Sequence, residues 1–526
     1  MAERQRYDAV VIGAGHNGLV AACYLVGAGL RVCVLERYHE VGGAAITEEL
    51  TPGFRVSTGS YVLSLAPRKI FDDLGAWDEG IELLERNPRF FAPFPDGTSM
   101  TFWNDPERAK AEIARFSPRD AEAYDAYDDF IERAARAMDT FILRPAPSYE
   151  EVASAFEGAP EERPLFEMLY QGSAADIAEH FFENERWQAV VAASGIIGTF
   201  RGPRDAGTGY VKLYHSMGMV TGRRGAWAYV RGAMGAVTQA LAKVARKRGV
   251  EIRTSAEVAE ILVDGTGRAT GVTLTSGEEV RAGVVLSNAD PKRTYLKLAP
   301  GSAVPADYRA KIEAIQIESP VVKINLALSE LPHFTALEGQ DQRQGTSGGL
   351  FIAPSIDYMQ TACEEARAGQ PATHPFMNIH LQSAVDDTVA PPGQHAISIF
   401  SQYFPYTLAD GTWDERREEI GDRIVEEFGQ YAPNVPGAVI ARQVLGPPDL
   451  ENRFGLTGGH IFQGELVPEQ GFDQRPVPGS TSYEGPIGGL FLCGAGAWPG
   501  GCVMGAPGHN AAHEVIARFN DIGGVA

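Results

Sequence analysis

The chain has 526 residues, and its 46 lysines and arginines against 68 aspartates and glutamates give a formal net charge of −22. No dense basic run offsets that deficit, which argues against a nucleic-acid partner and leaves peripheral membrane contact without support. With 44% hydrophobic and 22% charged residues, the chain has the composition of a folded globular protein rather than a disordered one.

Five scattered cysteines, with no CxxC or HExxH spacing, predict neither a disulfide framework nor a metal site. The first strand is expected to begin near Tyr7, which leaves no room for a cleavable leader. No run approaches the roughly twenty apolar residues of a membrane-spanning helix. These features together predict a cytoplasmic protein.

The amino-terminal segment has the order of a dinucleotide-binding unit. A β-branched strand, Tyr7–Ile12, runs into a glycine-rich turn at 13–18, an alanine-rich helix ends at Gly29, and a second strand ends at Glu36. In such a unit the N-terminus of the helix faces the phosphates of the nucleotide. The order predicts nucleotide binding without deciding between FAD and NAD.

Four residues of this unit have expected roles. Gly13 permits the tight turn, Gly15 lets backbone N–H groups approach a pyrophosphate, and Gly18 lets the helix pack closely against the strand. Glu36, eighteen residues after Gly18, is expected to accept hydrogen bonds from ribose hydroxyls.

A second glycine doublet, Gly42-Gly43, follows the acidic residue. Here the sequence resembles the flavoprotein superfamily of amine oxidases and phytoene desaturases, in which an FAD-binding GxGxxG precedes E(x)5GGxxxT, with Thr47 completing the match. Many members carry a basic residue directly after the doublet, where this chain has Ala44. Arg37 is the candidate replacement for that phosphate contact.

The middle of the chain predicts a helical region and a second sheet. A stripe of apolar residues over 121–141 predicts a core helix, with a helix lining an apolar substrate tunnel as the alternative. The segment 225–287 predicts a helix that ends near Arg248 and strands that return to the amino-terminal sheet. Further candidates are strands at Val321–Leu328, Phe376–Leu381 and His395–Gln402 and a helix at Trp413–Gln430.

Near the carboxy terminus, a buried strand at Leu490–Cys493 precedes a second glycine-rich turn and a helix to about Phe519. No strand with an acid follows, and no close cysteine pair exists, so the segment is neither a second dinucleotide unit nor part of a disulfide reductase. We expect the strand to join the amino-terminal sheet and to bring a helix N-terminus to the isoalloxazine, where reduction gathers negative charge.

The resemblance covers nearly the whole chain. It is greatest to the phytoene-dehydrogenase-like branch of pyridine nucleotide-disulfide oxidoreductase domain-containing protein 2, through stretches such as GAGHNGLVAACYL, VGGAAITEE and CGAGAWPGGCVMGAPGHNAA. It implies an α/β protein with a Rossmann-like FAD-binding domain of the glutathione-reductase type, formed by residues 1–70, 226–295 and 484–526. It also implies a discontinuous substrate-binding domain, with a mixed sheet and helices, formed by residues 71–225 and 296–483.

FAD is the implied cofactor. The residues expected to contact it are Gly13, Gly15, His16, Asn17, Gly18, Glu36, Arg37, Gly42, Gly43, Ala44, Val258, Gly494, Gly501, Val503 and Met504.

No nucleophile–base pair follows from spacing. His215 and His460 are candidates for proton transfer because an imidazole titrates near neutral pH, with a structural role as the alternative for each. Tyr214 stands beside His215, and Trp498 replaces the histidine that relatives carry in a GxHPGG turn. The GxSxG match at 345–349 follows a polar stretch rather than a strand, so it predicts a loop.

Three hypotheses of function stay open. The first is an FAD-dependent desaturase or dehydrogenase, or a saturase or isomerase, that acts on C–C bonds of an apolar or conjugated small molecule by hydride transfer at flavin N5. Its electron acceptor, oxygen or a quinone, and its oligomeric state are undetermined. The second is a flavin amine oxidase with an aromatic cage, for which Tyr403, Phe404 and Tyr406 are candidates. The third is a non-catalytic protein that binds a lipid or a partner.

Overall fold

The computed structural model describes residues 6–519, and its first sheet has seven strands. The strands β1 (Arg6–Ile12), β2 (Val32–Leu35) and β9 (Glu251–Arg253) are parallel neighbours. On the other side of β1 lies the parallel strand β12 (Glu279–Ser287), followed by the parallel strand β18 (Leu490–Leu492). Three distant segments therefore share one sheet, which confirms both the predicted return of the chain and the predicted place of the carboxy-terminal strand.

Two further strands extend this sheet. The antiparallel pair β10 (Val258–Val263) and β11 (Ala269–Leu274) follows the first half of β12, whereas β18 follows its second half. The long strand β12 thus serves as the central junction of the sheet.

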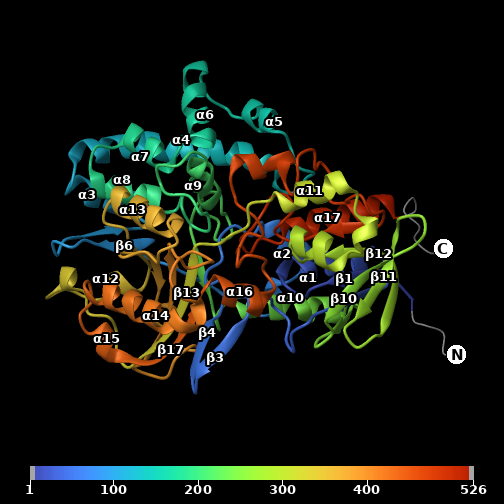
Figure 1. The fold of residues 1–526 in the computed structure, drawn as a ribbon. Helices are drawn as coiled ribbons and strands as arrows, with labels where there is room; N and C mark the ends of the chain where they lie inside the picture. The colour runs from blue at the N-terminus through green and yellow to red at the C-terminus, as the bar shows by residue number, and fades with distance from the viewer. Residues whose placement is uncertain (1–5, 520–526) are drawn as a thin grey trace.

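Three helices cover the sheet. Helix α1 (His16–Gly27) has no charged residue, and eight of its side chains are buried, because it packs against both α10 (Gly235–Lys247) and α17 (Ala506–Arg518). Figure 1 shows α1, α10 and α17 on the same side of the molecule as β1 and β12, with α2 (Arg68–Leu74) and α11 (Ala306–Glu313) close by.

The second sheet is mixed and has the order β17-β13-β16-β15-β14-β6-β7. Its only parallel pair is that of β14 with β6. The strands in chain order are β6 (Phe90–Pro93), β7 (Ser99–Phe102), β13 (Val321–Leu328), β14 (Gly349–Ile352), β15 (Phe376–His380), β16 (His395–Gln402) and β17 (Val439–Leu445). The three predicted strands are confirmed, and all eight residues of β13 are buried.

Three helices and two four-residue turns of helix accompany this sheet. They are α12 (Arg343–Thr346), α13 (Ile356–Arg367), α14 (Trp413–Gly429), α15 (Val435–Ala438) and α16 (Pro447–Phe454). Helix α14 confirms the predicted helix to within one residue and begins at a capping box formed by Thr412 and Glu415. The predicted loop at 345–349 is partly wrong, because residues up to Thr346 belong to α12 and Gly349 opens β14.

A helical layer lies at the top of the view in Figure 1. It contains α3 (Pro106–Ala114), α4 (Pro118–Ile142), α5 (Tyr149–Ser154), α6 (Arg163–Gln171), α7 (Ala174–Phe181), α8 (Glu185–Ala193) and α9 (Thr208–Ser216). The apolar stripe of α4 is buried from Tyr124 to Met138, which confirms its predicted role in the core.

Two small ladders complete the fold, β3 (Thr47–Thr51) with β4 (Phe54–Ser57) and β5 (Leu83–Glu85) with β8 (Ala228–Val230). All strands of the first sheet fall within the segments predicted to bind FAD, and all strands of the second fall within the other two segments. The domain boundaries themselves stay a prediction. Between residues 6 and 519, no helix combines the length and the apolar character needed to cross a bilayer.

Candidate active site

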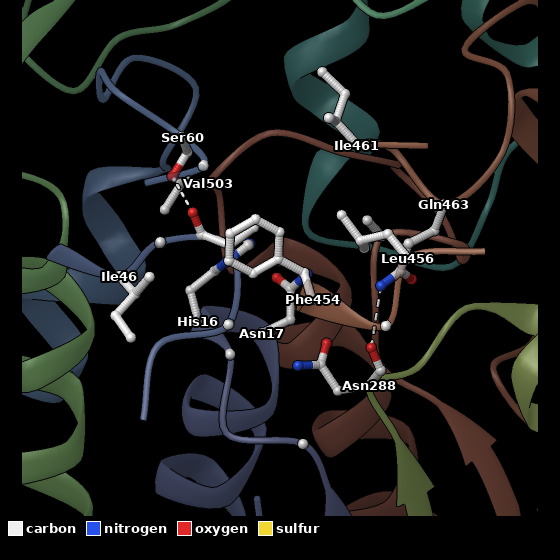
Figure 2. A pocket seen from close by; sticks show the side chains of 18 of the residues that line it. His16, Asn17, Ile46, Ser60, Asn288, Phe454, Leu456, Ile461, Gln463 and Val503 are labelled. Carbon is white, nitrogen blue, oxygen red and sulfur yellow. Dashed lines mark hydrogen bonds between the residues drawn. The ribbon is translucent and has the colours of Figure 1, made fainter. Parts of the chain in front are cut away.

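A deep cleft opens at the carboxyl ends of β1, β2 and β12 and holds about 2010 Å³ of empty space, including its open mouth. Both ends of the chain line it: Figure 2 shows His16 and Asn17 of the first glycine turn and Val503 of the carboxy-terminal turn around one hollow.

The first glycine turn forms the floor of the cleft. Gly13 has a φ of 93°, a left-handed conformation that favours glycine, and helix α1 begins directly after Gly15 with no side-chain cap. A Cβ on Gly15 would lie 2.9 Å from Nδ2 of Asn288, so a larger residue has no room there. Gly13, Gly15, His16 and Asn17 all line the cleft, and the uncapped first turn of the helix faces it.

Two polar atoms of this turn are buried without a hydrogen-bond partner, Nε2 of His16 and Oδ1 of Asn17. Burial lowers the pKa of His16 to about 4, which keeps its imidazole neutral at physiological pH. Buried polar atoms are almost always satisfied in native proteins, so these two mark a place that a ligand completes.

Gly18 does not line the cleft. A Cβ there would lie 2.2 Å from the carbonyl oxygen of Gly13, so the residue permits the close approach of helix to strand that the sequence predicts.

Glu36, at the tip of β2, lines the cleft and is only 7% exposed. Its carboxylate accepts hydrogen bonds from the backbone N–H groups of Ala14 (2.7 Å) and Tyr38 (2.9 Å). A carboxylate offers about four lone-pair sites, so these bonds orient Glu36 and leave acceptor capacity for a ligand.

The second glycine doublet lies against the first turn. The N–H of Gly42 donates to the carbonyl of Ala14 at 3.0 Å, and the φ of Gly42 is 138°. Gly43 and Ala44 line the cleft, whereas Gly42 lies behind them.

The predicted replacement of a phosphate-binding cation by Arg37 stays a prediction. Arg37 lies on the cleft wall, but one of its guanidinium nitrogens donates to the carbonyls of Asn452 (2.8 Å) and Arg453 (2.7 Å). Two cations not predicted from sequence, Arg293 and Arg453, share that wall.

The carboxy-terminal turn contributes differently from the expectation. Of its predicted residues only Val503 lines the cleft, together with the neighbouring residues Ala495 and Cys502. Gly494 and Gly501 lie behind the wall, where a Cβ would collide with Asn288 (2.7 Å) and Phe462 (2.0 Å) respectively.

The remaining predicted contacts, Val258 and Met504, also differ. Val258 lines the cleft near Glu36. Met504 does not line it, because its sulfur accepts the hydroxyl of Tyr214 at 3.7 Å.

The four catalytic candidates do not come together. Only His215 lines the cleft, and burial lowers its pKa to about 4 while its Nδ1 faces the carbonyl of Val211 at 2.9 Å. Tyr214 donates to the carbonyl of Gly501 at 3.0 Å, behind the cleft wall.

Trp498 and His460 do not line the cleft, so a catalytic role for them stays an untested prediction. Trp498 is 1% exposed, donates its indole N–H to the carbonyl of Phe141 at 3.1 Å and stacks on Phe472. His460 is fully buried, with Nε2 lying 3.8 Å from the carboxylate of Glu465. Both residues therefore serve the packing around the carboxy-terminal turn.

Lys323 on β13 is the functional candidate that sequence reasoning missed. It lines the cleft and is 2% exposed, and its ammonium nitrogen lies 3.2 Å from the carbonyl of Ser57, 2.6 Å from Oδ1 of Asn325 and 2.5 Å from Oγ of Ser398. Burial lowers its pKa from 10.5 to about 7. The available signal was a lone lysine within an otherwise apolar strand, VVKINLAL.

Aromatic side chains line the same cleft as Lys323. Tyr61, Trp227, Phe400 and Phe462 all line it, and the ammonium lies 5.7 Å from the ring centre of Tyr61. The residues named for an aromatic cage, Tyr403, Phe404 and Tyr406, do not line the cleft. Among the described residues, no cluster of metal-ligating side chains exists.

A parallel sheet with a glycine turn, an acid at a strand tip and a cleft shared by both chain ends define a dinucleotide-binding α/β protein. The family model of flavin containing amine oxidoreductase matches residues 18–516. The chain therefore belongs to the flavin-containing amine oxidoreductases, an FAD-dependent oxidoreductase family related to the phytoene desaturases.

Similar proteins match over nearly their whole lengths. The mouse pyridine nucleotide-disulfide oxidoreductase domain-containing protein 2 is 40% identical, with 99% of this chain and 95% of the relative covered. A limonene dehydrogenase polypeptide of Castellaniella defragrans is 28% identical, with 98% and 95% covered. The structure of putrescine oxidase bound to putrescine shares the fold at a TM-score of 0.60 and 15% identity, with 98% and 99% covered.

Proposed function

We propose that the chain binds FAD along the cleft and oxidises a C–C bond of an apolar or conjugated small molecule. The observation that carries this proposal is the composition of the cleft, which starts at Glu36 and the glycine turn and ends at a buried amine among aromatic rings. The printed names of relatives, a limonene dehydrogenase and phytoene desaturases, support an apolar substrate.

The residues of the cleft fit FAD. The uncapped first turn of α1 suits a pyrophosphate, and Glu36 has acceptor capacity for ribose hydroxyls. The unpartnered atoms of His16 and Asn17 lie on the same floor. Val258, at the Glu36 end, is the proposed neighbour of the adenine.

The chain's own residues supply orientation, exclusion of water and a proton acceptor. When bound, FAD supplies the acceptor for hydride, and dioxygen or a quinone is the class of oxidant that restores it. The accompanying proton from the substrate goes to the neutral amine of Lys323, whose pKa of about 7 suits a general base. Tyr61, Trp227 and Phe462 provide apolar surface that excludes water from this end.

The test is a visible absorption spectrum of the purified protein, followed by anaerobic titration with polyenes, quinones and amines. We expect a flavin spectrum that a polyene bleaches, and loss of that bleaching with retained FAD in Lys323→Met. A colourless protein that takes up no added FAD would leave only the non-catalytic hypothesis. Peroxide release that depends on an amine would replace C–C oxidation by amine oxidation.

A further inference from the structure

A second cavity of about 1340 Å³ of empty space lies beside the first cleft, between the helical layer and the second sheet. His215 and Trp227 line both cavities, and their rings are 6.0 Å apart. These two side chains therefore form the wall between the proposed flavin site and the second cavity.

One side of the second cavity is aromatic. Phe90, Phe102, Tyr124, Tyr127 and Trp187 line it, with ring centres of neighbouring members 4.9 to 6.5 Å apart. Tyr124 and Tyr127 come from the apolar stripe of α4. The surface suits a flat or extended apolar molecule.

The other side carries a buried guanidinium without a carboxylate partner. Arg86 is 8% exposed, its guanidinium donates to the carbonyl of Trp227 at 3.2 Å and lies 3.3 Å from Nδ1 of His380, and the Tyr229 hydroxyl is a further partner. Within residues 6–519 it forms no ion pair. Because guanidinium stays protonated in proteins, Arg86 is a fixed positive charge in the wall of this cavity.

A buried carboxamide lines the same cavity as Arg86. Asn378 is 1% exposed, and neither its Oδ1 nor its Nδ2 forms a hydrogen bond of ordinary geometry, although the Tyr61 hydroxyl lies close enough to interact with it. It lies two residues before His380 on β15, so both side chains project from the same face of the sheet. The desolvation of such unpartnered groups is costly, and a ligand that bonds to them offsets it.

The other charges around the cavity leave it positive. Lys212, which is 9% exposed, donates to Ser216 Oγ at 3.2 Å, and Arg89 bonds Asn104 at 3.4 Å; neither forms an ion pair among the described residues. Arg223 pairs with Glu85, and Arg224 pairs with Glu132 and Asp139.

The remaining carboxylate that lines the cavity is Asp128. Burial raises the pKa of Asp128, which disfavours its charged form, and its Oδ1 accepts the hydroxyl of Tyr124 at 3.4 Å. The cavity therefore presents Arg86, Arg89 and Lys212, the last with a pKa that burial lowers to about 8, against the single acid Asp128, in a chain whose net charge is −22.

We infer that the second cavity binds the acid end of a carboxylate substrate, with the acid on Arg86 and Asn378 and the adjoining apolar part along the aromatic side, while the reacting C–C bond lies beyond His215 and Trp227 in the first cleft. This inference rests on the proposed function, since it names the substrate class of the same reaction. A guanidinium pairs with a planar carboxylate through two parallel hydrogen bonds, and the Asn378 amide adds a donor. The same charges disfavour an ammonium substrate.

The test uses the FAD-loaded protein and cis-parinaric acid, a conjugated fatty acid that fluoresces on leaving water, with its methyl ester as the uncharged match. We expect the acid to bind at least tenfold more tightly than the ester. Arg86→Gln should abolish that preference, Asn378→Leu should reduce it, and Arg86→Lys should keep part of it. Arg115→Gln, at an exposed arginine, is the control and should change neither affinity.

Flavin absorbance separates this inference from the proposed function. Arg86 and Asn378 lie outside the first cleft, so their variants should keep the flavin content of the parent protein. Equal affinity for acid and ester, or an equal loss of both in Arg86→Gln, would overturn the carboxylate site. If the acid binds selectively but no carboxylate bleaches the flavin under anaerobic conditions, the role of the carboxylate site in substrate recognition would be overturned. Absence of flavin would overturn the proposed function, while the titration with acid and ester would still decide the site.

Discussion

Replacing Lys323 with methionine should make folding stability less dependent on pH. Lys323 is buried, and its pKa is lowered from 10.5 to about 7. Between these values the folded chain holds the amine neutral, whereas the unfolded chain holds it charged. Unfolding therefore takes up a proton, and the stability of the parent protein rises with pH across this window.

The size of the effect follows from the shift. A difference of about 3.5 pKa units at about 1.4 kcal/mol each is a penalty of about 5 kcal/mol near pH 7, which disappears towards pH 10.5. Lys323→Met removes this penalty and also removes hydrogen bonds to Ser57, Asn325 and Ser398, a loss that does not vary with pH in this window. As the pH rises, the free energy of unfolding of the variant minus that of the parent should thus fall by about 1.4 kcal/mol per pH unit.

Urea unfolding between pH 7.5 and 9.5, with the same excess of FAD throughout, measures this difference. The matched control is Lys69→Met, which replaces an ion-paired lysine whose side chain is 63% exposed, and no comparable slope is expected there. A difference between Lys323→Met and the parent that stays constant across the two pH units would refute the buried neutral amine, and with it the proposed base.

Three further predictions concern the cleft and the packing of α17 against α1. Glu36→Gln should raise the Kd for FAD roughly tenfold to a hundredfold, because a charge-assisted hydrogen bond contributes about 1.5–3 kcal/mol. Fluorescence titration measures this Kd, with Glu40→Gln as the control, and an unchanged Kd would exclude the ribose contact. Gly508→Ala places a Cβ 2.1 Å from a backbone oxygen of α1, so it should destabilise the protein by about 1–3 kcal/mol and lower its Tm. The control Gly265→Ala, which has open space around it, should leave the Tm unchanged. His215→Asn should alter the rate of anaerobic flavin reduction but not how that rate varies between pH 6 and 9, because His215, with a pKa of about 4, is already neutral there. A changed pH dependence of the rate would make His215 the titrating group.

The sequence predicts the nucleotide half of the fold well because each step there is local. The strand, turn, helix and acid from Tyr7 to Glu36 follow one another within a single unit, and the buried strand at Leu490–Cys493 has few other places to pair. The chemical end of the cleft is harder to predict. It depends on side chains from β13, α9 and the loop at Tyr61, which only the tertiary fold brings together.

The predicted residues that do not line the cleft have a common origin. Trp498, His460 and Met504 were chosen from motifs near the glycine turn, but proximity in sequence does not decide whether a side chain faces the cleft or the core. Lys323 carried the opposite signal, a charge in an apolar strand, which a motif search passes over. A buried cation is costly, so its presence at such a position is itself a reason to expect function.

Arg86 and Lys323, the two buried basic side chains of this region, also act on a common neighbour. The guanidinium of Arg86 donates to Nδ1 of His380, whose ring lies 4.5 Å from that of Tyr61 on the cleft wall. Burial, together with the charges of Arg86 and Lys323, holds the pKa of His380 well below its usual range, so the imidazole stays neutral. Arg86, His380, Tyr61 and Lys323 include no carboxylate that would neutralise the charge of Arg86, although the chain carries a large excess of acids. Because no protein carboxylate pairs with this buried guanidinium, a bound molecule can supply the negative charge. This is why we place the carboxylate of the substrate at Arg86.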